Sequence, residues 1–190
     1  MQRPAVFLDR DGTLIEDVGY VDRLERLRLY PWSLESVKLL RRSGYAVVVV
    51  TNQAGVARGM VREQAVIDVY DRIQHCLSEI GEQLDGHYYC PHLATAAVKA
   101  YRRTCSCQKP KPGMLLQAAK DLDLDLGRSV VVGDRWTDVQ LARAVDAKAI
   151  LVRTGYGVTQ LEDPPTGEAA DKVADHLLGA VGWILRQGRS

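Results

Sequence analysis

Short apolar runs and amphipathic segments alternate along this chain. The run at residues 45–50 is apolar at successive positions and rich in β-branched side chains, so neither of its faces suits water. Such a pattern is typical of a parallel strand that helices cover on both sides of its sheet. Runs of the same character are found at residues 4–8, 129–132 and 149–152.

Between these runs, apolar residues recur at helical spacing. One segment has a suitable N-cap at Ser33 and a stop signal at Gly44, and Pro112 is suited to open another helix. The alternation predicts a Rossmann-like, doubly wound parallel α/β sheet, whose ligands bind at the carboxyl ends of the strands. The helices are expected at residues 33–43, at 63–80, from 112 onward, at 137–145 and at 175–186.

Two carboxylates follow the first predicted strand directly, in the sequence D-R-D-G-T at residues 9–13. Asp9 and Asp11 lie two positions apart, so both would face the same crevice. Such a pair binds Mg²⁺, which prefers hard oxygen ligands and shares them with phosphate. It also suits a two-step phosphoryl transfer, in which one carboxylate attacks and the other moves the proton of the leaving group. The alternative interpretation is a solvated acidic turn.

Three other element ends carry chemistry that fits the same crevice. Thr51 ends the second strand and offers a hydroxyl to a phosphoryl oxygen. Lys109 lies just before the helix that Pro112 opens, where it can neutralise charge in a transition state. Asp134 follows the strand at 129–132 and can complete a Mg²⁺ shell. Each of these three residues alone could be a helix cap or a solvated charge. Together with the D-R-D motif they give four matches in chain order, which favours one shared site.

With these motifs in place, the chain resembles the haloacid dehalogenase superfamily, through D-x-D-x-T, a strand-end Thr, a Lys and G-D-x-x-x-D. The resemblance implies that Asp9 is the nucleophile and Asp11 the general acid and base. Thr51 and Lys109 would hold the phosphoryl oxygens, and Asp9, the Asp11 carbonyl and Asp134 would bind Mg²⁺. The second aspartate of the first motif is typical of the phosphatases and phosphomutases of this superfamily.

A second metal site is predicted by the spacing C-x-H, twelve residues, C-x-C. Cys90, His92, Cys105 and Cys107 form a closed Cys₃His set, which is typical of structural Zn²⁺. The loop between the two pairs is polar and basic, so a metal would be needed to order it. The alternative is a set of unrelated cysteines, or a disulfide between two of them. Cys76 lies in an apolar helical pattern and is expected to be a buried hydrophobe.

The position of the zinc loop, just before the motif lysine, resembles two families of phosphatases. These are the D-glycero-D-manno-heptose-1,7-bisphosphate 7-phosphatases, which act in nucleotide-activated heptose and lipopolysaccharide core biosynthesis, and the histidinol-phosphate phosphatases. Both usually carry Arg before the motif lysine, where this chain has Gln108, and Gln cannot clamp a phosphate with two parallel hydrogen bonds. Nearby cations at Lys99, Arg102, Arg103 or Lys111 could compensate. The resemblance implies substrate contacts from Arg10, Asp17, Tyr20, Asn52, Gln53, Arg58, Gln108 and Arg135, with support from Asp138.

Length and charge limit what else the chain can be. Its 190 residues suffice for one compact domain, so we expect a single domain across residues 1–190, with the zinc loop at about 90–107. The inserts after the first two strands are too short for a cap domain, so the site should be open. The 25 basic and 24 acidic residues nearly cancel, which argues against nucleic-acid or membrane partners. We expect a complete, cytoplasmic, monomeric enzyme with a small sugar phosphate as substrate.

Three other functions remain to be compared with this one. A histidinol-phosphate phosphatase would need an acidic or aromatic pocket for its cationic imidazole, and the sequence shows no such cluster. A zinc-containing nucleic-acid-binding module is suggested by the basic zinc loop, but aromatic residues are not interleaved with its charges. A receiver-like signalling protein would store its phosphoaspartate, whereas the paired aspartates favour turnover.

Overall fold

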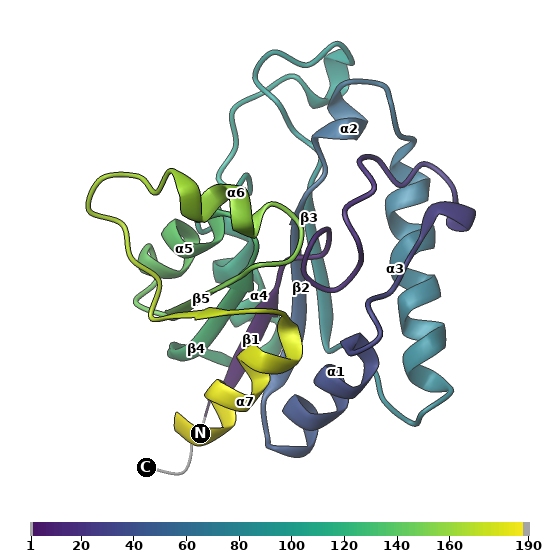
Figure 1. Cartoon of the computed structure of the whole chain (residues 1–190). Coiled ribbons are helices and arrows are strands. Elements are labelled where there is room, and N and C mark those ends of the chain that lie inside the picture. The colour runs from purple at the N-terminus through teal and green to yellow at the C-terminus, as the bar shows by residue number, and fades with distance from the viewer. Residues whose placement is uncertain (1, 188–190) are drawn as a thin grey trace.

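The computed structural model describes residues 2–187, which form one parallel sheet of six strands with helices on both faces (Figure 1). The strand order is β3-β2-β1-β4-β5-β6, so the chain moves outward from β1 first in one direction and then in the other. Loops that leave β1 and β4 therefore diverge at the carboxyl edge, where open sheets bind their ligands. The strands are β1 (Arg3–Leu8), β2 (Ala46–Asn52), β3 (Gly86–Cys90), β4 (Leu124–Gly133), β5 (Lys148–Val152) and β6 (Lys172–Ala174).

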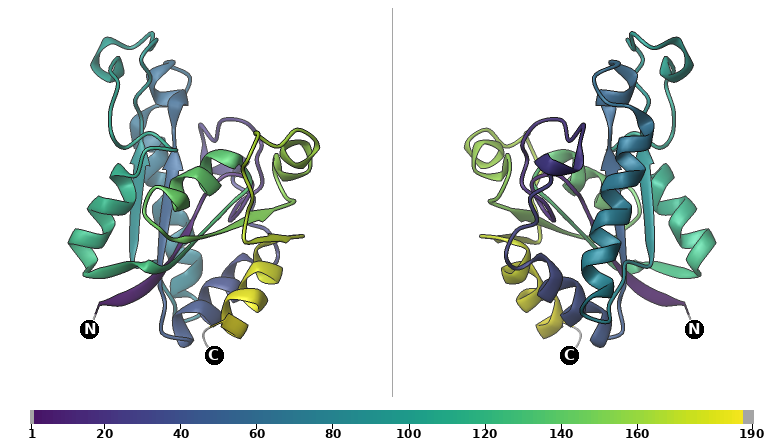
Figure 2. Two further views of the ribbon diagram at one scale, coloured as in Figure 1. Left: turned by 90° about the vertical axis from the view of Figure 1, so that its left-hand side faces the viewer. Right: turned by 90° about the vertical axis from the view of Figure 1, so that its right-hand side faces the viewer.

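Side chains of β1 alternate between two apolar layers. Val6 and Leu8 pack under α1, α3 and α7, whereas Ala5 and Phe7 pack under α4 and α5. Figure 2 shows these two helical layers on opposite sides of the sheet. The predicted fold class, a doubly wound parallel α/β sheet, is confirmed. The helices are α1 (Ser33–Arg42), α2 (Ala54–Ala57), α3 (Glu63–Ser78), α4 (Gly113–Leu122), α5 (Trp136–Arg143), α6 (Gly157–Glu162) and α7 (Leu177–Gln187).

The predicted elements differ from the observed ones mainly at the edges of the sheet. Strands β3 and β6, and the short helices α2 and α6, have no counterpart among the predictions. The prediction of an N-cap at Ser33 is wrong. Ser33 is the first residue of α1 and is buried, and its hydroxyl donates a hydrogen bond of 2.6 Å to the Leu14 carbonyl. It therefore ties the start of the helix to the loop after β1. Gly44 does end α1, with a positive φ of 87°.

The inserts near the carboxyl edge of the sheet are short. The segment between β1 and α1 contains only the 3-10 turn η1 (Leu24–Arg26), and the segment between β2 and α3 contains only α2. The longer loop between β3 and α4 extends beyond α2 at this end of the molecule (Figure 2) and contains the 3-10 turn η2 (Lys99–Tyr101). Among residues 2–187, no helix has both the length and the apolar composition that crossing a membrane would require.

Candidate active site

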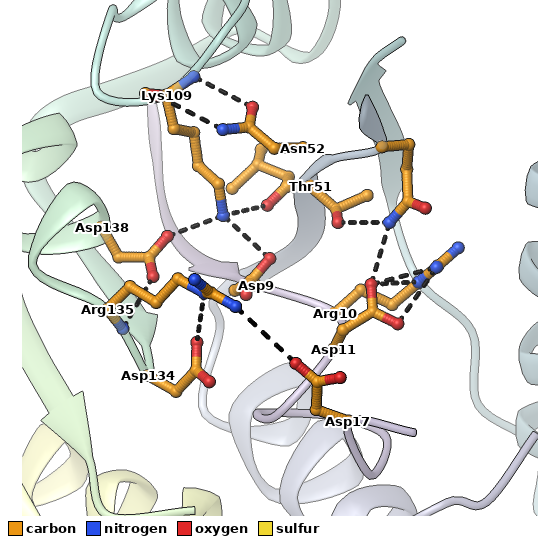
Figure 3. Close-up of polar contacts among 12 residues, drawn as sticks. Asp9, Arg10, Asp11, Asp17, Thr51, Asn52, Lys109, Asp134, Arg135 and Asp138 are labelled. Atoms are coloured by element: carbon orange, nitrogen blue, oxygen red, sulfur yellow. Dashed lines mark hydrogen bonds and ion pairs between the residues drawn. The ribbon is translucent and has the colours of Figure 1, made fainter. Parts of the chain in front are cut away.

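A cavity of about 540 Å³ opens at the carboxyl edge of the sheet. Its walls are formed by side chains from the ends of β1 and β2, from the loop before α4 and from the start of α5, several of which are drawn in Figure 3. Ten of the sequence-predicted site residues contribute to its lining. The lining residues are Asp9, Asp11, Asp17, Gly19, Tyr20, Thr51, Asn52, Gln53, Ala54, Arg58, Lys109, Arg135, Thr137 and Tyr156.

Lys109 is the centre of a buried ion-pair network. Its Nζ donates to Asp9 Oδ1 at 2.8 Å, to Asp138 Oδ1 at 2.6 Å and to the Val50 carbonyl at 3.1 Å (Figure 3). Burial opposes the lysine charge, but the charges of Asp138 and Asp9 outweigh it and raise the pKa of Lys109. Burial also raises the pKa of Asp9 to about 6, against the opposing effect of Lys109. The lysine thus stays charged, and Asp9 is a carboxylate above that pH.

Asp134 is a fully buried carboxylate whose two oxygens differ in their partners. Its Oδ2 accepts a hydrogen bond of 2.7 Å from the Tyr156 N–H. Its Oδ1 has no hydrogen-bond partner among the described residues, and Arg135 Nε lies 3.9 Å away. Burial and then the charge of Asp9 raise the pKa of Asp134 to about 8. A buried carboxylate oxygen without a donor has the chemistry of a cation ligand.

Two glycines leave the space that Asp134 occupies. Gly12 has φ +83° and Gly155 has φ +58°, and a side chain at either position would collide with the Asp134 carboxylate. Oxygens of Asp9, Asp134 and Asp138 lie within 4.8 Å of one another. Both oxygens of Asp138 accept hydrogen bonds, Oδ1 from Lys109 and Oδ2 from the Arg135 N–H. Among the described residues, donors reach only one oxygen of Asp9 and one of Asp134, so these two carboxylates each keep an oxygen that can bind a metal. This donor set fits Mg²⁺, which takes a few carboxylate oxygens and completes its shell with water and phosphate.

The end of β2 supplies groups with two different tasks. The Asn52 amide binds the backbone of Lys109 twice, since it donates to the Lys109 carbonyl at 3.2 Å and accepts from the Lys109 N–H at 3.0 Å. It therefore fixes the loop that carries the lysine. Gln53 Nε2 donates to Thr51 Oγ1 at 2.9 Å and to Asp11 Oδ2 at 2.8 Å, so it joins the strand end to the D-x-D motif. Both residues had been expected to contact substrate, and both line the cavity.

Arg10 lies elsewhere than expected. Its side chain is only 2% exposed and does not line the cavity, and its guanidinium binds the Asp11 carboxylate through two hydrogen bonds of 3.0 and 3.1 Å. Burial removes it from direct contact with a substrate, so we correct that expectation. Gln108 also lies outside the lining, as do the four cations expected to replace an arginine there. Arg102 and Lys111 instead donate to carbonyls of the zinc loop itself.

The rim combines charge with aromatic surface. The Arg135 guanidinium lies 3.8 Å from the centre of the Tyr156 ring, and Arg135 also approaches Asp17 at 3.8 Å. Arg58 donates a hydrogen bond to the Tyr20 hydroxyl at 2.5 Å. Tyr156 was not predicted, because it follows β5 in a short loop without a sequence motif. Its position after a buried strand at the carboxyl edge was the one signal that could have revealed it.

The four predicted zinc ligands come together in the structure. The Sγ atoms of Cys90, Cys105 and Cys107 lie 3.2 to 3.5 Å apart, and His92 Nδ1 lies 3.3 Å from Cys107 Sγ. All three thiols are free of disulfides. Three sulfurs and one imidazole nitrogen around one point form a donor set that fits a closed tetrahedral zinc ion. This cluster begins where β3 ends and finishes two residues before Lys109.

Comparison with known proteins agrees with this geometry. A family model described as "HAD-hyrolase-like" matches residues 106–180. The D-glycero-beta-D-manno-heptose-1,7-bisphosphate 7-phosphatase of Yersinia pestis is 41% identical over 94% of this chain and 91% of its own length. The enzyme of that name from Escherichia coli K12 is 40% identical over 97% of this chain and 95% of its own. The crystal structure of D,D-heptose 1.7-bisphosphate phosphatase from B. bronchiseptica, complexed with magnesium and phosphate, superposes with a TM-score of 0.85 at 29% identity, over 97% of this chain and 99% of that one. The chain is a phosphoric monoester hydrolase and belongs to the heptose-1,7-bisphosphate 7-phosphatase family of haloacid dehalogenase-like phosphatases.

Proposed function

We propose that this phosphatase works through a phosphorylated Asp9 and depends on Mg²⁺. The observation that carries the proposal is the pairing of Asp9 with Lys109 beside a buried Asp134 oxygen that no donor in residues 2–187 reaches. Asp9, the Asp11 main-chain carbonyl and Asp134 would hold the ion, which would screen the repulsion between Asp9 and an anionic phosphate. Nucleophilic attack, proton transfer and binding of the phosphoryl oxygens are assigned to side chains of the protein.

The reaction proceeds in two displacements at phosphorus. An oxygen of Asp9 forms a bond to phosphorus, the bond from phosphorus to the ester oxygen breaks, and Asp11 gives its proton to the departing alkoxide. Water then attacks the phosphoaspartate and loses a proton to Asp11, which releases inorganic phosphate and regenerates the Asp9 carboxylate. Protons and charge balance over the cycle, with Asp11 first as acid and then as base.

Lys109 and Thr51 bind the oxygens of the phosphoryl group that is being transferred. Lys109 is held by three acceptors, one of them on Asp138, so its ammonium is fixed in place before a substrate arrives. A fixed charge needs no reorganisation in the transition state, and such electrostatic preorganisation is usually the largest contribution to catalysis. Asp138 supports the lysine in this scheme and does not bind the metal.

We assign D-glycero-D-manno-heptose 1,7-bisphosphate as the substrate and its C7 phosphate as the leaving group. The names of the relatives support this assignment. So does the presence of two further cations on the cavity wall, Arg58 and Arg135, which could bind the second phosphate that Gln108 cannot clamp. The pathway would then be nucleotide-activated heptose and lipopolysaccharide core biosynthesis.

Histidinol phosphate is the second candidate substrate, and one observation favours it. A neighbouring cavity of about 420 Å³ shares Asp17 and Tyr156 with the first and is lined further by Glu16 and Tyr30. Two carboxylates beside two aromatic rings could receive a cationic imidazole. The same groups also suit a sugar, whose hydroxyls donate to carboxylates, so the two substrates must be compared directly.

The proposal extends to the organisation of the chain. We infer that residues 1–190 act as a single monomeric domain, with the zinc loop as a structural clip and not as a catalytic centre. The observation that supports a structural role for the zinc loop is that Cys90, His92, Cys105 and Cys107 already supply four donors and that none of them lines the cavity. The near balance of basic and acidic residues gives no support to a nucleic-acid-binding role.

The first experiment measures kcat/KM with Mg²⁺ for both anomers of the heptose bisphosphate and for L-histidinol phosphate. We expect a strong preference for one bisphosphate anomer, and the Asp9→Asn variant should have no turnover with any substrate. An Asp9→Asn variant with full activity would end the phosphoaspartate proposal. A preference for histidinol phosphate would keep that chemistry but reassign the substrate. In the bisphosphate case, Arg58→Ala and Arg135→Ala should raise KM more for the bisphosphate than for the corresponding monophosphate.

A further inference from the structure

Arg10 is a buried cation whose single acidic partner, among the described residues, is Asp11. Its Nε donates to Asp11 Oδ2 at 3.0 Å and its Nη2 donates to Asp11 Oδ1 at 3.1 Å. This is the parallel, two-bond geometry that makes arginine–carboxylate pairs strong and directional. Among the described residues, the guanidinium thus forms hydrogen bonds with one carboxylate of the site only.

The other neighbours of Arg10 do not compete for its charge. His87 stacks between the rings of Tyr70 and Tyr89, at centroid distances of 4.5 and 5.5 Å. Burial and then the Arg10 charge lower the pKa of His87 to about 4, so this imidazole is neutral at physiological pH. The remaining nitrogen, Arg10 Nη1, is buried and has no hydrogen-bond partner in the part of the chain that the structure describes. The side-chain hydrogen bonds of Arg10 within residues 2–187 therefore all go to one aspartate.

The consequence lies in what Asp11 can do while this contact holds. Its Oδ1 accepts from Arg10, and its Oδ2 accepts from Arg10 and from Gln53 Nε2 at 2.8 Å. A carboxylate has about four acceptor positions on its two oxygens, so these three hydrogen bonds leave one position, on Oδ1, through which Asp11 can exchange a proton. In Figure 3 the Asp11 carboxylate is turned toward Arg10 and not toward Asp9. The three bonds thus fix the orientation of the Asp11 carboxylate.

We propose that Arg10 is a positioning residue for Asp11, whose carboxylate it orients for proton transfer. This inference rests on the proposed role of Asp11 as acid and base. While the Arg10 bonds hold, the unused position on Oδ1 is fixed in the direction from which Asp11 gives a proton to the leaving alkoxide and later takes one from water; without them the carboxylate can turn away. Arg10 itself touches neither substrate nor phosphorus, so its contribution is confined to steps in which Asp11 moves a proton.

Because Arg10 should affect only the steps in which Asp11 transfers a proton, a positioning role can be distinguished from a merely structural one. Nitrophenolate leaves without needing a proton, whereas the alkoxide of a sugar phosphate needs one. With enzyme in excess, we would measure the single-turnover release of nitrophenolate from p-nitrophenyl phosphate, and the single-turnover cleavage of a phosphorus-labelled hexose 6-phosphate. For Arg10→Met, we expect sugar phosphate cleavage to fall by at least ~10-fold, the lower end of what general acid catalysis contributes, and nitrophenolate release to stay within ~2-fold of the unmodified enzyme. Asp11→Asn should show the same asymmetry.

Equal losses with both substrates, or no loss with either, would overturn the inference. If Arg10→Met does not fold, Arg10→Lys serves in its place, because it removes the paired hydrogen bonds to Asp11 and keeps a cation at the same position. Lysine keeps the charge but not the paired geometry, so it should show the asymmetry to a smaller extent. A failure of the phosphoaspartate proposal would be recognised separately, since it would leave Asp9→Asn active in the same assay.

Discussion

Asp134→Asn is expected to stabilise the metal-free protein at alkaline pH, although it should abolish magnesium binding. The carboxylate of Asp134 is fully buried, and one of its oxygens has no donor among the described residues. Asparagine has nearly the same shape and can still accept the hydrogen bond from the Tyr156 N–H. Its amide N–H groups would face Asp9, so a repulsive contact becomes a hydrogen-bonding one. The replacement therefore removes a buried charge without opening a cavity.

The magnitude follows from the raised pKa of Asp134. Its folded pKa of about 8 lies above the ordinary value of 3.8, so the folded protein keeps a proton there that the unfolded chain releases. Stability should accordingly fall as pH rises between these two values, by ~1.4 kcal/mol per pH unit, and reach a total on the order of 5 kcal/mol. Asp9, whose pKa is raised to about 6, adds a smaller decrease that ends near that pH. Asparagine at position 134 removes the larger of these two pH-dependent losses of stability.

Urea unfolding followed by circular dichroism, at pH 5 to 9 and in the presence of a chelator, would measure this difference. The unmodified protein should lose stability steadily toward pH 8, and Asp134→Asn should lose much less. Excess Mg²⁺ should restore the unmodified protein but not the variant. The exposed Asp163 provides the control, since Asp163→Asn should follow the unmodified protein. If Asp134→Asn were the less stable protein at pH 8.5 without metal, the argument from a buried repulsive carboxylate would be refuted.

Three further substitutions test other parts of the site. In Gly12→Ala, the new side chain would be strained by the positive φ and would collide with the buried Asp134 carboxylate. Calorimetry should therefore show weaker Mg²⁺ binding and a stability loss of ~2 kcal/mol or more. The control Gly44→Ala has the same strain without the collision and should keep its Mg²⁺ affinity. Cys107→Ser should lose zinc in metal analysis and unfold at lower temperature, whereas Cys76→Ser should do neither. Asn52→Ala removes two hydrogen bonds from the loop of the motif lysine, so kcat should fall ~10-fold while the protein stays folded, with unchanged kcat as the contrary result.

The sequence predicted best where chemistry coincides with the end of a buried strand. Asp9, Thr51 and Asp134 each follow or end a continuous apolar run. Because parallel strands all end at one edge, Asp9 and Thr51 line the same cavity and Asp134 lies beside Asp9. The Cys/His cluster could be predicted equally well, because two closely spaced pairs of ligands define a site regardless of the conformation of the loop between them. Strand β3 was missed because Gly86–Cys90 mixes Gly, His and Tyr, and its half-buried side chains give no apolar pattern.

What the sequence could not predict were directions and partners of side chains. Nothing in D-R-D-G-T tells whether Arg10 faces a substrate or turns back to its neighbour, because that depends on the apolar and aromatic space beside His87. Asn52 and Gln53 read as polar groups near a phosphate, yet their amides are occupied by Lys109 and by the motif aspartate. Both outcomes are set by contacts between segments far apart in the chain, and local patterns do not record such contacts.

The buried acidic side chains of the candidate active site lower the stability of the fold. Asp9 and Asp134 are buried close together with raised pKa values, and Lys109 offsets only part of their repulsion because Asp138 also draws on its charge. Hydrophobic replacement would relieve this repulsion in an ordinary core, but in the proposed mechanism each carboxylate has a role at phosphorus or at the metal. A bound cation would relieve the same repulsion, so the crowding of these carboxylates favours cation binding. A dianionic phosphate could then enter a cavity whose own charges would otherwise repel it, which would account for the presence of the proposed metal ligands and the nucleophile in one buried cluster.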